Sequence, residues 1–146
     1  MIILRSVYHQ LLRSPEIPPE TGGILGMKDS VINSICFDSG LSHSSSCNEY
    51  VPDVSFFNNC IDAWQKNGIV FCGMFHTHLP QWSTLSGGDK TYIRCIMNSL
   101  PRSINQLFFP LVFPGHSIRS FVAIRENNRI YINEDTITIV ETEAYL

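Results

Sequence analysis

Two histidines and a following aspartate have the spacing of a metal site. His76 and His78 stand at the end of an apolar run, residues 69–76, and Asp89 follows after a polar connection. Residues two apart on a strand project from the same face, so the two imidazoles can converge on one point. Imidazole and carboxylate are both good zinc ligands, with bonds of ~2.0–2.2 Å. Three protein ligands leave a fourth tetrahedral position for water, which is typical of a catalytic zinc site.

Two other residues are candidates for the rest of the chemistry. Glu20 precedes a glycine-rich segment, residues 21–26, whose small side chains allow another backbone to approach closely. We expect its carboxylate to take a proton from a zinc-activated water and return it to the leaving amine. Ser86 has two interpretations, which are compatible. Its place fits the N-cap of a helix with Asp89 at the third position, and its hydroxyl is also a candidate hydrogen-bond donor to an oxyanion.

The segment Glu20-Thr21-Gly22-Gly23-Ile24-Leu25, with His-x-His-x7-Ser-x2-Asp over residues 76–89, resembles the JAMM (MPN+/JAB) metalloprotease family. The resemblance implies a cytidine-deaminase-like JAB/MPN fold, an α/β fold with a mixed, curved β-sheet flanked by helices. It implies that His76, His78 and Asp89 hold one Zn²⁺, that Glu20 is the general acid/base, and that Ser86 contacts the oxyanion. One position departs from the family pattern: Leu79 stands where proline usually follows the second histidine, so we expect a different loop path there.

The resemblance also implies a class of substrate. Family members cleave isopeptide or peptide bonds at the C-terminus of ubiquitin and ubiquitin-like proteins, so such a protein or its conjugate is the expected partner. The compact form resembles stand-alone prokaryotic members that are encoded beside ubiquitin-like, E1-like and E2-like proteins in antiviral defence operons. Processing of a sulfur-carrier protein remains an alternative. A catalytically silent binding scaffold is another, although silent members usually lack the metal ligands that are present here.

The composition argues against several classes of protein. The 146 residues carry a net charge of −3, which argues against a nucleic-acid binder with a basic face. No stretch approaches the ~18 apolar residues of a membrane span, and Arg5, His9 and Arg13 interrupt any signal-peptide core. We therefore expect a cytoplasmic protein with a single domain, residues 1–146.

The five cysteines include no C-x-x-C pair and are expected to be reduced. A zinc nucleobase deaminase would need H-x-E and P-C-x-x-C motifs, which are absent.

The hydrophobic pattern predicts the elements that position these residues. Helices are expected at residues 3–14 and 53–66 and from Ser86 onward. Strands are expected at residues 22–27, 31–37, 69–76, 107–113, 118–125, 129–132 and 136–142, and a long exposed loop at 38–53. The order α-ββ-α-β-α-ββββ predicts a layered α/β domain with a mixed sheet.

Several residues near the motif have simpler interpretations. His9, His43 and His116 lack suitable partners and are expected at the surface or in packing. Trp82 and Leu85 lie in the connection between His78 and Asp89, where they either line a substrate groove or hold the loop in place.

Overall fold

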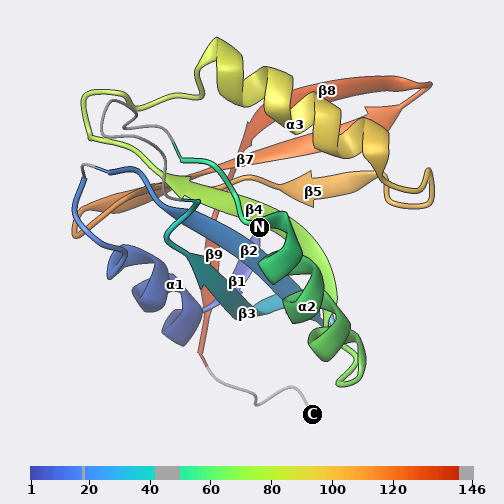
Figure 1. Ribbon diagram of the computed structural model, residues 1–146, viewed down its shortest axis with the longest axis horizontal. Helices are drawn as coiled ribbons and strands as arrows, with labels where there is room; N and C mark the ends of the chain where they lie inside the picture. Colours follow the sequence, from blue (N-terminus) through green and yellow to red (C-terminus); the bar gives the residue numbers. More distant parts are fainter. Residues whose placement is uncertain (18, 42–49, 142–146) are drawn as a thin grey trace.

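One mixed sheet and three helices make up the part of the chain that the structure, a computed structural model, describes: residues 1–17, 19–41 and 50–141 (Figure 1). The strands are β1 (Ile2–Leu4), β2 (Gly22–Lys28), β3 (Val31–Asp38), β4 (Val70–Thr77), β5 (Gln106–Phe108), β6 (Leu111–Phe113), β7 (Ser117–Glu126), β8 (Arg129–Asp135) and β9 (Thr138–Val140). The helices are α1 (Arg5–Leu12), α2 (Val54–Gln65) and α3 (Gly87–Ser99).

Two of the predicted elements are corrected by the structure. The helix expected at residues 3–14 begins only at Arg5, because Ile2–Leu4 forms β1, which pairs with β3 and β9. The strand expected at residues 107–113 is divided into β5 and β6 by Phe109 and Pro110. Proline cannot donate a ladder hydrogen bond, which explains the break. Both short strands pair with β4 and β7 in one continuous register, so together they occupy a single position in the sheet.

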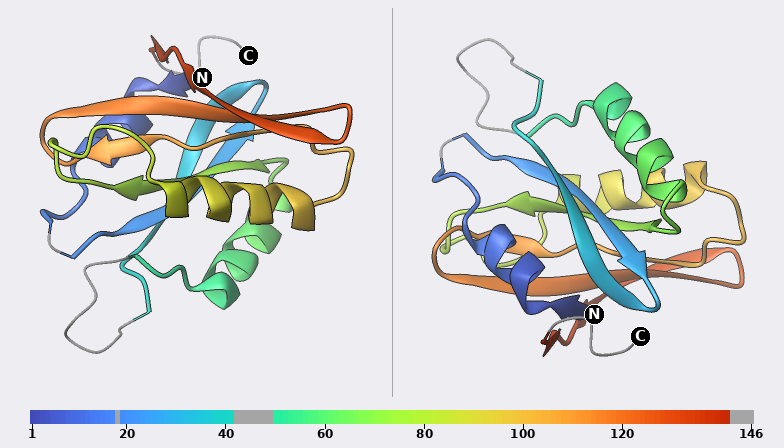
Figure 2. Two further views of the ribbon diagram at one scale, coloured as in Figure 1. Left: turned by 90° about the horizontal axis from the view of Figure 1, so that it is seen from above. Right: turned by 90° about the horizontal axis from the view of Figure 1, so that it is seen from below.

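The sheet is mixed, and helices cover both of its faces. Across the sheet the strands run β8, β7, β5 with β6, β4, β2, β3, β1 and β9. The pairings of β1 with β3 and β9, and of β4 with β5 and β6, are parallel, and the others are antiparallel. Helix α1 packs on one face, and α2 and α3 pack on the other (Figure 2). The general α/β prediction, with a mixed sheet flanked by helices, is therefore confirmed.

The core is divided between the two faces of the sheet. The buried residues of α1 are Val7 and Leu11, and those of α3 are Ile93 and Met97. Strand β4 contributes Phe75 to the cluster under α1, whereas its neighbour Met74 packs against the cluster under α3. Because β4 is covered on both faces, its sequence reads as a continuous apolar run. This central strand is the one that carries the two histidines.

Two expectations about the chemical environment can be compared with the described residues. The cysteines among them are all free thiols: Cys36, Cys60, Cys72 and Cys95. Cys47 and His43 lie outside the described residues. Within residues 1–17, 19–41 and 50–141, no helix is long and apolar enough to cross a membrane.

The contact between β4 and β5 requires a glycine at position 73. Gly73 pairs with Phe108, and a Cβ atom at Gly73 would overlap the carbonyl oxygen of Phe108. We predict that Gly73→Ala lowers the free energy of unfolding by about 3 kcal/mol, because the backbone of β5 must move away. The control is Gly87→Ala, where an added Cβ meets no atom within 4 Å. Urea unfolding of both variants without metal tests the difference, and equal stabilities would contradict the steric argument.

Candidate metal centre

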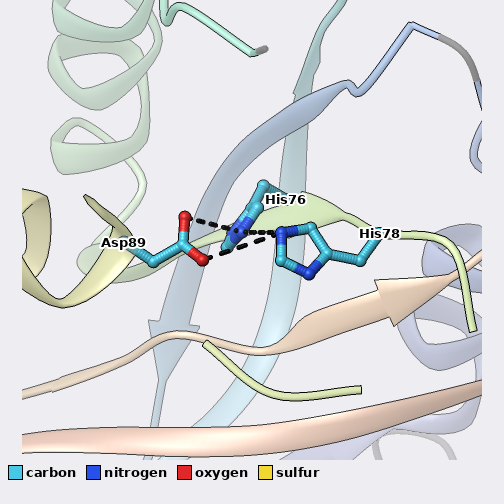
Figure 3. Close-up of side chains that lie close together, drawn as sticks. All are labelled: His76, His78 and Asp89. Atoms are coloured by element: carbon cyan, nitrogen blue, oxygen red, sulfur yellow. Dashed lines mark hydrogen bonds and ion pairs between the residues drawn. The ribbon is translucent and has the colours of Figure 1, made fainter. Parts of the chain in front are cut away.

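The two histidines converge because of the alternation of strand β4. His76 lies within β4 and His78 just beyond its last residue, so both point to the face that α3 covers (Figure 3). Their Nε2 atoms are 3.1 Å apart. The end of β4 is held from both sides, because the His78 amide donates to the Val112 carbonyl of β6 at 2.9 Å and the Thr77 amide donates to the Thr21 carbonyl at 2.9 Å. The imidazoles therefore extend from a fixed backbone.

Asp89 approaches the histidines from the first turn of α3. Its Oδ1 lies 3.3 Å from His76 Nε2, and its Oδ2 lies 3.7 Å from His78 Nε2. Ligands at ~2.1 Å from a tetrahedral zinc ion are separated by roughly 3.4 Å. The distances between the two imidazole nitrogens, and from each of them to a carboxylate oxygen of Asp89, are close to this separation. This triad is a possible metal site, as the sequence predicted.

A backbone carbonyl sets the orientation of the second histidine. Nδ1 of His78 lies 3.0 Å from the carbonyl oxygen of Trp82, which can only accept a hydrogen bond. Nδ1 therefore carries the proton in the neutral ring, and the lone pair of Nε2 faces His76 and Asp89. Metal-binding histidines in proteins usually have a partner of this kind. A turn closed by the Trp82 amide and the Leu79 carbonyl, 2.9 Å apart, brings the carbonyl of Trp82 into place.

The surroundings favour the protonation states that bind a cation. Burial, and the charge that His76 carries when protonated, lower the pKa of His78 below its ordinary value, which favours the neutral imidazole. For Asp89, burial by itself would raise the pKa, but the hydrogen bond and charge of His76, with two hydrogen bonds to Ser86, hold it well below the ordinary value. A neutral imidazole and an ionised carboxylate are the forms that coordinate metal ions.

Glu20 is brought to the triad by the register between β2 and β4. Gly22 pairs with His76, and the ladder continues outward through Thr21 and Thr77. The Thr77 amide donates to the Thr21 carbonyl at 2.9 Å, and the Thr21 amide donates to Thr77 Oγ1 at 2.9 Å. The next residue outward is Glu20, whose Oε1 lies 3.7 Å from His78 Nε2. Its carboxylate thus lies beside the three candidate ligands, as expected.

Ser86 caps helix α3 and also borders the site. Its Oγ accepts from the Asp89 amide at 3.1 Å, and its own amide donates to Asp89 Oδ2 at 2.7 Å, which completes a capping box. A hydroxyl that accepts one hydrogen bond still has a proton to donate. Ser86 lines a cavity of about 290 Å³ together with Glu20, His76 and Asp89. The capping prediction is confirmed, and the same residue borders the cavity.

The structure separates the two candidate roles of the loop between His78 and Asp89. Leu85 is buried, with 3% of its surface exposed, and belongs to the cluster under α3, so it holds the loop in place. The side chain of Trp82 is 56% exposed, and its contribution to the triad is the backbone carbonyl. Arg119 also binds this loop, since it donates to the Ser83 carbonyl at 2.5 Å and pairs with Glu134. His9 and His116 are both exposed, as expected.

The sequence alone did not reveal four further residues that line the cavity. Tyr50, Val51 and Pro52 line it from the connection before α2, and Tyr92 lines it from α3. No spacing rule marks these positions, because they meet only when the connection folds back over β2.

Comparison with known proteins gives information about the fold but not about the chemistry of the site. No known family model matches the chain, and no curated protein matches it in sequence. A solution structure of a Desulfitobacterium hafniense protein is similar, with a TM-score of 0.70 and 17% identity over 99% of this chain and 97% of that one. A second, from Salinibacter ruber, has a TM-score of 0.55 and 14% identity over 100% of this chain and 95% of that one. At these identities the likeness shows a shared fold alone.

The triad leads to a prediction about metal binding. Replacement of His78 by alanine should weaken the binding of Zn²⁺ by more than about 100-fold, since loss of an outer-shell contact alone costs ~10–100-fold. Competition with a chromophoric chelator measures the affinity directly. The control is His116→Ala, which removes an exposed imidazole far along the chain from the triad. Equal zinc affinity in the two variants would show that the triad is not the metal site.

Proposed function

We propose that this protein is a zinc-dependent protease of the JAMM type, with the JAB/MPN fold, that cleaves after the C-terminal tail of a ubiquitin-like protein. The observation that carries the proposal is the position of the Glu20 carboxylate, 3.7 Å from His78 Nε2 and beside the triad. Two imidazoles and one carboxylate this close together suit zinc, and three ligands leave a position open. The substrate class rests on the family resemblance of the motif.

Each residue of the site has its own role in the proposed hydrolysis. His76, His78 and Asp89 would hold Zn²⁺, which activates water as a nucleophile and polarises the scissile carbonyl. Glu20 accepts the proton of the attacking water on its carboxylate and donates it to the nitrogen of the leaving amine. The Ser86 hydroxyl, which borders the same cavity, donates a hydrogen bond to the oxygen that becomes negative.

The cavity beside the triad suits an extended peptide. Apolar side chains line most of it, including Met74, Tyr92 and Phe109. Four polar residues of the site border the same cavity: Glu20, His76, Ser86 and Asp89. An extended tail with small residues, such as Gly-Gly, brings its carbonyl to the metal without a side chain that would collide with the walls. Proteins that supply such a tail, with the E1-like and E2-like enzymes that conjugate it, are the proposed partners.

The role of Glu20 gives the first test of this function. We predict that zinc-loaded wild-type protein cleaves a fluorogenic substrate with a Gly-Gly C-terminus, and that Glu20→Gln lowers kcat by about 10²–10⁴-fold while zinc content stays equimolar. Glutamine keeps the size of the side chain but cannot accept a proton. Glu16→Gln is the matched control, because Glu16 is an exposed acid in the same connection. A Glu20→Gln variant as active as the control would refute the proposed mechanism.

The second test separates the two roles of Ser86. Ser86→Ala removes the helix cap, which should lower stability by about 1 kcal/mol. It also removes the oxyanion donor, which should lower kcat by about 10²-fold. Ser99→Ala removes a hydroxyl bonded to Ile96 at the other end of the same helix and should leave kcat unchanged. If Ser86→Ala loses stability but retains the wild-type kcat, Ser86 acts only as a cap.

A further inference from the structure

A buried carboxylate ties together the two ends of the connection between β3 and α2. Asp38, the last residue of β3, is only 8% exposed. Its Oδ1 accepts from the Gly40 amide at 2.9 Å, and its Oδ2 accepts both the Tyr50 hydroxyl at 3.0 Å and the Asp53 amide at 2.9 Å. We call these three hydrogen bonds the Asp38 clamp. One donor lies near the start of the connection and two lie near its end, so the clamp brings the ends together.

The clamp fixes the ring of Tyr50 against the strands of the metal centre. A Cβ atom added at Gly22 would collide with Cε1 of Tyr50 and would lie 2.8 Å from its Cζ, so the ring packs directly on Gly22. Gly22 is the residue that pairs with His76. Tyr50 and the two residues after it line the same cavity as Glu20 and Asp89. The clamp therefore sets the position of one wall of the cavity.

The hydrogen-bonding groups of the Asp38 clamp stabilise this position of the Tyr50 ring. Burial, followed by the negative charge of Asp38, raises the pKa of Tyr50 well above its ordinary value, so the hydroxyl remains a donor at neutral pH. Hydrogen bonds to an ionised acceptor are stronger than those between neutral groups. An acceptor oxygen shared by Tyr50 and Asp53 also couples the ring to the start of α2. The three hydrogen bonds of the clamp involve none of the candidate ligands, so they can be changed without removing a ligand of the metal site.

We propose that Asp38 and Tyr50 are positioning residues that hold the substrate-binding wall of the cavity and take no part in bond cleavage. The inference rests on the proposed protease function, because the wall matters only if a peptide lies against it. If the wall binds the tail of the substrate, its displacement weakens binding in the ground state and transition state alike. Such a loss raises KM and leaves kcat unchanged.

Conservative variants test the positioning role in the zinc-loaded protein. Tyr50→Phe keeps the ring and removes the donor. Asp38→Asn keeps the shape but turns one acceptor oxygen into an amide nitrogen, so at least one of the three donors loses its partner. Each should raise KM for the fluorogenic Gly-Gly substrate on the order of tenfold, as expected from the loss of one hydrogen bond to a charged group. Zinc content and kcat should stay at the wild-type level. Tyr131→Phe, which removes an exposed phenol hydroxyl on β8, is the matched control.

A second measurement tests the clamp without any substrate. Hydrogen exchange of at least one of the Gly40 and Asp53 amides should accelerate about tenfold or more in Asp38→Asn, because they donate to different oxygens and asparagine keeps only one of them. If the wild-type protein cleaves nothing, the protease function fails, and the exchange rates still decide whether the clamp exists. Unchanged exchange in Asp38→Asn would overturn the clamp. A fall in kcat with unchanged KM would overturn the positioning role and place these residues in the chemistry instead.

Discussion

The register between β2 and β4 is the constraint on which the candidate site depends. A shift of one residue would turn His76 and His78 to the opposite face of the sheet, because side chains alternate along a strand. It would also separate Glu20 from them. The register is held by Gly22 opposite His76 and by the reciprocal bonds between Thr21 and Thr77. A Cβ at Gly22 would lie 2.6 Å from the Phe75 carbonyl, so glycine permits this close pairing.

Asp89 links the sheet to helix α3 through one carboxylate. Oδ2 accepts the Ser86 amide at 2.7 Å, which starts the helix, and Oδ1 faces His76 at 3.3 Å. The capping box that begins α3 therefore also orients the third candidate ligand. Because Ile93 and Met97 bury α3 against the sheet, the helix cannot rotate its first turn away from the histidines without loss of core packing. The triad is thus assembled at the end of β4 and at the capped start of α3.

The residues that sequence could identify are those fixed by local geometry. The two-residue period of a strand relates His76 to His78, and the capping box relates Ser86 to Asp89. Glu20 was predicted from its place before the glycine-rich segment and from the family resemblance, but its distance to His78 depends on pairing between strands distant in sequence. The short strand β1 escaped prediction for the same reason: Ile2–Leu4 is followed at once by helical spacing, and only pairing with β3 and β9 makes it a strand. The contact of the Trp82 carbonyl with His78 could not be predicted from the sequence, because a backbone carbonyl is present at every residue.

Under the proposed function, catalysis and substrate binding belong to different kinds of structure. Every candidate ligand extends from the end of a strand or from a capped helix start, where backbone hydrogen bonds limit movement. One wall of the cavity belongs instead to an irregular connection, which Asp38 holds by three hydrogen bonds. A metal site must keep its donor atoms within a few tenths of an ångström, whereas a binding wall can change shape to suit another substrate. Under the proposed function, the same fixed triad could act on different peptide tails if the connection before α2 varied.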